Sequence, residues 1–66
     1  MKDAKSQLKS LLAYWLEHNR EHGAEFREWA DKMKTDHKEV AEQLRQAADK
    51  MDEVDQFLKQ AQKLLK

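Results

Sequence analysis

The stretch that decides the fold is residues 14–30, which read YWLEHNREHGAEFREWA. Trp15, His22 and Trp29 lie seven residues apart in it, and side chains at that spacing fall on one face of an α-helix. The spacing crosses Gly23 without a change of phase, whereas a helix broken at this glycine would be free to change it. We therefore predict a single helix that continues through Gly23, although glycine costs about 1 kcal/mol relative to alanine inside a helix.

The same spacing extends in both directions and returns in the second half of the chain. Steps of three and four residues join two sets of side chains: Leu8, Leu12, Trp15, Asn19, His22, Phe26, Trp29 and Met33, then Val40, Leu44, Ala47, Met51, Val54, Leu58, Ala61 and Leu65. We expect these two stripes to pack against each other, which predicts an all-α fold, a long antiparallel helical hairpin. Most other positions are charged or polar and are expected to face solvent.

The hairpin is predicted to form one domain of two helices joined by a turn. The predicted bounds, within residues 1–66, are about 3–34 for the first helix, about 34–36 for the turn and about 36–65 for the second helix. Asp3 is expected to cap the first helix. Thr35 or Asp36 is expected to cap the second, and Asp36 with Glu39 fits a capping box.

A chain of 66 residues rarely builds a core worth more than about 3–5 kcal/mol by itself. Two helices also cover only one side of each other, while Leu11, Leu16, Phe57 and Leu64 flank the predicted stripes. We therefore expect a homodimer in which two hairpins complete a four-helix bundle.

Composition argues against several classes of function. Thirteen basic and thirteen acidic side chains balance, so no positive field attracts nucleic acid. The chain has no cysteine, which removes disulfides and thiolate metal sites and fits the cytoplasm. It has no apolar run long enough to cross a membrane. We expect no enzyme, because no histidine stands at a helical spacing that would activate Ser6 or Ser10.

His18 and His22 are four residues apart, so one helix face presents both and they can chelate a single ion. Nitrogen ligands suit Ni²⁺, Zn²⁺, Co²⁺ or Cu²⁺. Folding the chain back at the turn brings Met51, Asp52 and Asp55 near this level of the hairpin, as candidate additional ligands. Asn19 is a candidate for orienting a ligand.

A structural interpretation of the same residues stays open. His18, Asn19 and His22 would then form a polar layer that sets the register of the helices and the oligomeric state. The chain would serve as a structural or protein-interaction module, with a larger protein as a candidate partner.

The residues Trp15, Glu17, His18, Asn19 and His22 carry a resemblance that spans nearly the whole chain. They form the motif W-x-E-H-N-x-x-H, and the chain resembles a small uncharacterised prokaryotic helical-hairpin domain that has this motif. Such domains are similar to segments attached to nickel-, cobalt- or zinc-handling proteins. The resemblance implies a small metal-binding protein in a carrier or sensor role. The residue before the motif is Tyr14, where the pattern often has a histidine.

Overall fold

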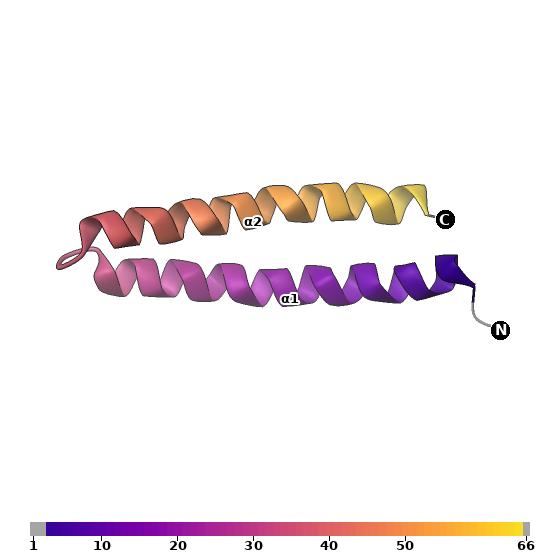
Figure 1. Ribbon diagram of the computed structural model, residues 1–66, viewed down its shortest axis with the longest axis horizontal. Coiled ribbons are helices and arrows are strands. Elements are labelled where there is room, and N and C mark those ends of the chain that lie inside the picture. The colour runs from indigo at the N-terminus through magenta and orange to yellow at the C-terminus, as the bar shows by residue number, and fades with distance from the viewer. Residues whose placement is uncertain (1–2, 66) are drawn as a thin grey trace.

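The computed structural model describes residues 3–65. Two helices, α1 (Ala4–Met33) and α2 (Lys38–Leu64), run antiparallel and are joined by a short turn. Figure 1 shows them side by side along their whole length, with the start of α1 and the end of α2 opposite the turn. The hairpin is long and thin, with extents of 54 × 18 × 11 Å. The predicted helical hairpin is therefore confirmed.

The first helix begins as the sequence predicts. Asp3 has an extended backbone, and its Oδ1 accepts a hydrogen bond of 2.8 Å from the backbone N–H of Ser6. This bond satisfies one of the N–H groups that the first turn of a helix leaves without a partner. It also holds the pKa of the Asp3 carboxyl below its usual value.

The second helix begins later than expected, and the prediction that Thr35 or Asp36 caps it is wrong. The backbone N–H of His37 donates to the carbonyl of Met33 at 2.8 Å, so the chain keeps a helix-like turn after α1 ends. Thr35 and Asp36 lie within that turn. His37 occupies the cap position of α2 without a hydrogen bond from its side chain.

The first helix continues through Gly23, as predicted. Gly23 does not have the positive φ that would end a helix there. A Cβ placed on it would have one neighbour within 4 Å, the guanidinium of Arg27 at 3.9 Å. Neither backbone conformation nor crowding therefore requires a glycine at this position.

The two helices meet along a line of mostly small side chains, called here the inner seam. Its fully buried members are Leu12, Gly23, Ala30, Ala41 and Ala48. Ala41 and Ala48 have no exposed surface, and Leu12 keeps 2%. Small side chains let helix axes approach closely, so this stripe makes the contact between α1 and α2.

The predicted contact stripes were therefore partly wrong. Large members of those stripes keep much of their surface exposed: Leu8, Trp15, Trp29, Val40 and Val54. The stripe that packs shares Leu12 and the half-buried Leu44, Met51 and Leu58 with the predicted stripes. Elsewhere it lies beside them, as Ala48 shows by being buried where its neighbour Ala47 is exposed. The predicted stripe holds the bulkier side chains, which would keep the helix axes further apart.

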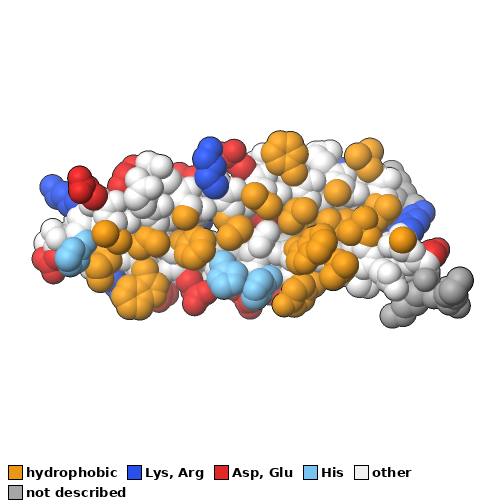
Figure 2. Space-filling model, viewed as in Figure 1, with side chains coloured by type: hydrophobic (Ala, Val, Ile, Leu, Met, Phe, Trp, Pro, Cys, Tyr) orange, Lys and Arg blue, Asp and Glu red, His pale blue; other side chains and the backbone are white. Residues whose placement is uncertain are grey.

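The exposed apolar side chains form a second feature, called here the outer face. We define it by Leu8, Leu11, Trp15, Trp29, Val40 and Val54. Figure 2 shows hydrophobic side chains gathered in a band along both helices, with histidine side chains beside the band near the middle of the long axis. Over the described residues, neither helix has an apolar stretch that could cross a membrane.

Candidate metal-binding site

His18 and His22 lie near the middle of α1, one helical turn apart, and their rings are in contact. The two Nε2 atoms are 3.1 Å apart, and the ring centroids are 4.4 Å apart with the planes nearly perpendicular. Both side chains are about half exposed, at 48% and 42%. The predicted pair is thus brought together with its ring nitrogens facing each other and open to solvent.

Aromatic side chains extend this pair in both directions along α1. The ring of Tyr14 stacks on His18 at 5.4 Å between centroids, and His22 stacks on Phe26 at 6.1 Å. Four rings therefore follow one another at i, i+4 spacing. Tyr14 and Phe26 limit the directions in which the imidazoles can turn, which favours the arrangement with the Nε2 atoms facing each other.

Two glutamates lie on the other side of the imidazole rings. Nδ1 of His22 is 3.4 Å from Oε1 of Glu25, and Nδ1 of His18 is 3.9 Å from Oε1 of Glu21. At 3.4 Å, the Glu25 carboxylate favours a proton on Nδ1 of His22 and leaves Nε2 of that ring with a free lone pair, whereas 3.9 Å is beyond hydrogen-bond distance for Glu21 and His18. Sequence reasoning missed both glutamates, although each follows its histidine by three residues, a spacing that brings side chains together on a helix.

The distance between the Nε2 atoms suits one shared ion. Two nitrogens bound at about 2.0–2.1 Å lie about 3.3 Å apart on a tetrahedral metal and about 2.9 Å apart at right angles. The observed 3.1 Å falls between these values. In the metal-free protein, Nε2–H of His18 can then donate a hydrogen bond to Nε2 of His22, and a metal ion would take the place of that hydrogen bond.

The candidate additional ligands do not join the pair. Among residues 3–65, no three His, Asp or Glu side chains gather closely enough to hold a metal ion. Asp52 accepts a hydrogen bond of 2.8 Å from Arg27, and Asp55 accepts one of 3.0 Å from the amide of Asn19. Met51 is partly buried. One chain therefore offers two nitrogen ligands.

The three residues of the predicted polar layer lie in two different environments. Asn19 lies partly buried between the helices, where its side-chain amide donates to Asp55 across the hairpin. His18 and His22 stand outside the contact between the helices. Nearby, Arg27 bridges the helices by donating to Asp49 at 3.1 Å and to Asp52. The hydrogen bond with Asp52 contributes most to raising the pKa of the Arg27 guanidinium.

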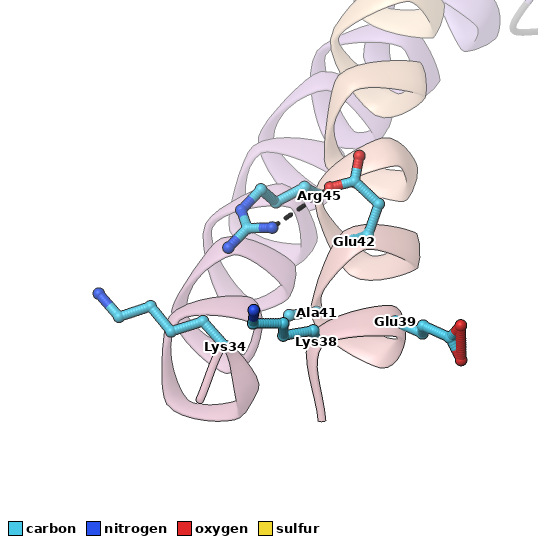
Figure 3. Close-up of a pocket in the computed structure, with 6 residues that line it drawn as sticks. All are labelled: Lys34, Lys38, Glu39, Ala41, Glu42 and Arg45. Atoms are coloured by element: carbon cyan, nitrogen blue, oxygen red, sulfur yellow. Dashed lines mark hydrogen bonds and ion pairs between the residues drawn. The ribbon is translucent and has the colours of Figure 1, made fainter. Parts of the chain in front are cut away.

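A hollow of about 420 Å³ lies beside the turn, away from the histidine pair. Figure 3 shows its lining residues: Lys34, Lys38, Glu39, Ala41, Glu42 and Arg45. The side chains of Lys34 and Glu39 point away from each other, and Arg45 pairs with Glu42 at 3.3 Å. These side chains do not converge on a common point, so we assign the hollow no binding role.

The fold and the exposed histidine pair define a small helical-hairpin protein. The chain belongs to the family described as a domain of unknown function (DUF8180), whose model matches residues 8–65. It is also similar to an uncharacterized protein from Archaeoglobus fulgidus, with 44% identity over 55 residues that cover 83% of this chain and 89% of the relative. No solved structure matches the chain.

Proposed function

We propose that this protein binds a divalent transition metal ion through Nε2 of His18 and Nε2 of His22. The observation that carries the proposal is the 3.1 Å between these two atoms, which fits two ligands of one ion. Glu25 supports it, because a carboxylate close to Nδ1, here at 3.4 Å from that of His22, orients a metal-binding imidazole and increases its basicity. Candidate ions are Ni²⁺, Zn²⁺, Co²⁺ and Cu²⁺.

The arrangement favours a carrier or sensor role over a permanent structural role. A structural zinc site is closed by four protein ligands, whereas one chain offers two here. Both histidines are reachable from solvent, so an ion can enter and leave without unfolding the hairpin. We propose no catalytic activity, and a cytoplasmic location stays a prediction from composition.

Metal titration of the untagged full-length protein tests this function. We expect each of the four ions to raise the melting temperature at pH 7.5, because an ion that binds the folded state stabilises it by mass action. The shift should shrink at pH 5.5, where protons compete for the imidazole nitrogens.

Three alanine variants make the test specific. His18→Ala and His22→Ala should each lose the shift, because a single imidazole cannot chelate. His37→Ala should keep it, because His37 lies at the start of α2 and outside the pair. A melting temperature that none of the four ions changes, or a shift that survives in both His18→Ala and His22→Ala, would overturn the proposal.

A second candidate function is a structural or protein-interaction module, and one observation favours it for Asn19. The hydrogen bond from Asn19 to Asp55 joins the helices at a partly buried position, and a polar contact of this kind favours one register over others. Replacing both residues with leucine should leave metal binding intact but permit other registers. Disulfide trapping between cysteines placed along α1 and α2 would detect them.

A further inference from the structure

The outer face is large for a chain of this size. Trp15 and Trp29 expose 38% and 49% of their surface, and the aliphatic members of the face are similarly exposed. Since a tryptophan presents roughly 250 Å² when free, these six side chains together expose several hundred Å² of largely apolar surface. A patch of that size is near the upper end for monomeric proteins, and it approaches the roughly 800 Å² per partner that a standard dimer interface buries.

The inner seam buries little apolar side-chain surface. Its fully buried members comprise one leucine, three alanines and one glycine. Burial of a leucine contributes about 1.5–3 kcal/mol and an alanine much less, against a backbone entropy cost of about 1–2 kcal/mol per ordered residue. Covering the outer face would therefore add to the stability of the long helices.

The histidine pair is itself incomplete, because tetrahedral zinc takes four ligands and one chain supplies two nitrogens. A second copy of the chain supplies two more. Net charge does not oppose this pairing, since each copy carries thirteen basic and thirteen acidic side chains.

The position of the pair along α1 selects the arrangement of the two copies. The helix runs from Ala4 to Met33, and the histidines at 18 and 22 lie at its middle. Two copies can stack with their outer faces together, related by a two-fold axis that lies between the faces and runs across the helices at this level. In this arrangement α1 of one copy lies on α1 of the other, and the two run in opposite directions. Residues whose numbers sum to 40 then face each other: His18 meets His22 of the second copy, and Leu11 meets Trp29 of the second copy.

We infer that two copies of this chain pack by their outer faces and share one metal ion, held by His18 and His22 of both copies. This inference rests on the proposed metal-binding function and names the second copy as the partner that completes its site. If the histidines lay near one end of α1, this antiparallel stacking would place the two copies' histidines far apart. Because they lie at its middle, the stacking places the two pairs next to each other.

Native mass spectrometry with Zn²⁺ alone, on the full untagged chain, counts chains and ions directly. We expect dimers that carry one Zn²⁺, and sedimentation should show that Zn²⁺ lowers the dimer dissociation constant. One Zn²⁺ per chain, in monomers or dimers, would overturn the shared site and leave the proposed function standing. Absence of bound Zn²⁺ in every species would overturn both.

Variants of the outer face separate the interface from the ligands. Trp29→Glu and Leu11→Glu keep both histidines, yet each should weaken the dimer on the order of 30-fold or more and lower Zn²⁺ affinity with it. Phe57→Glu is the matched control, because Phe57 is 75% exposed and outside the defined face, and it should leave both unchanged. Circular dichroism checks that each variant stays helical.

The double variant His18→Leu/His22→Leu completes the test. It should lose Zn²⁺ but keep the dimer, because leucine at both positions makes the stacked faces more apolar. If Trp29→Glu and Leu11→Glu, while helical, bind Zn²⁺ as tightly as the parent protein, the shared site is wrong.

Discussion

The inner seam and the outer face run along the same two helices and differ in the size of their side chains. The seam buries alanines, a glycine and Leu12, whereas the face leaves two tryptophans and several aliphatic side chains in contact with solvent. In a finished monomer the largest apolar side chains would be inside. The reversed arrangement is the one expected if the hairpin is half of a larger core, with close approach of its own helices on one side and the larger side chains on the side that the proposed dimer covers.

Alanine variants of the adjacent leucines Leu11 and Leu12 are expected to give the largest change in the free energy of unfolding. Leu12→Ala should lower the free energy of unfolding by about 2–5 kcal/mol, because it empties a position in the inner seam. Leu11→Ala, on the outer face, should cost less, and its cost should shrink on dilution as dimers dissociate. Chemical denaturation at two protein concentrations measures both. Equal costs for the two leucines at low concentration would remove the distinction between seam and face.

The adjacent alanines Ala47 and Ala48 test the inner seam by the addition of side-chain volume. Ala48→Leu should lower the free energy of unfolding by about 1–3 kcal/mol, since a larger side chain at a fully buried position forces the helices apart. Ala47→Leu adds the same volume at an exposed position and should be close to neutral in the monomer. A tolerated Ala48→Leu would mean that the helices are not held at close approach.

Gly23 gives a smaller effect of opposite sign. Gly23→Ala should raise the free energy of unfolding by about 0.5–1 kcal/mol, because alanine restricts the unfolded chain and its Cβ meets only the flexible end of Arg27. Ala24→Gly, at the exposed neighbouring position, should lower it by a similar amount. A loss of stability in Gly23→Ala would indicate that something approaches this glycine more closely than Arg27 does.

The smallest effect concerns Asp3, which belongs to neither surface. The pKa of its carboxyl is lower in the folded state than its ordinary value of 3.8, mainly through the hydrogen bond from the Ser6 backbone. The ionised Asp3 carboxylate therefore stabilises the folded state. This stabilisation is complete above the ordinary pKa and disappears as the pH falls through the pKa of the folded state. Asp3→Asn keeps a capping acceptor without the charge. The difference in melting temperature between the parent and this variant should therefore shrink from pH 6 to pH 2, and a constant difference would contradict the assignment.

The hairpin and the continuity of α1 were predictable from sequence because both depend on local spacing. The contact stripe was not, because two neighbouring stripes in each half share the same three-and-four spacing. Hydrophobicity favours the stripe with Trp15 and Trp29, and close approach favours the stripe with Ala30. Only the fit of both helices to each other decides between these criteria.

The candidate site was likewise predictable only where local spacing decides it. The pairing of His18 with His22 was predictable because the two residues are one helical turn apart. Glu21 and Glu25 escaped notice because acidic side chains occupy much of the surface and their spacing to the histidines looks like ordinary charge pairing. Asp52 and Asp55 were candidate ligands because they lie near the same level of the hairpin, but Asp52 accepts a hydrogen bond from Arg27 and Asp55 accepts one from Asn19.

The thin shape of the hairpin has a consequence for small-angle scattering. Its radius of gyration is 15.4 Å, whereas a compact chain of this length would have about 11 Å. A second hairpin stacked 8–10 Å away thickens only the shortest dimension, so the radius of gyration rises to only about 16 Å. The forward intensity per mole of particle, in contrast, grows with the square of mass. Dimerisation would thus change the forward scattering intensity far more than the radius of gyration.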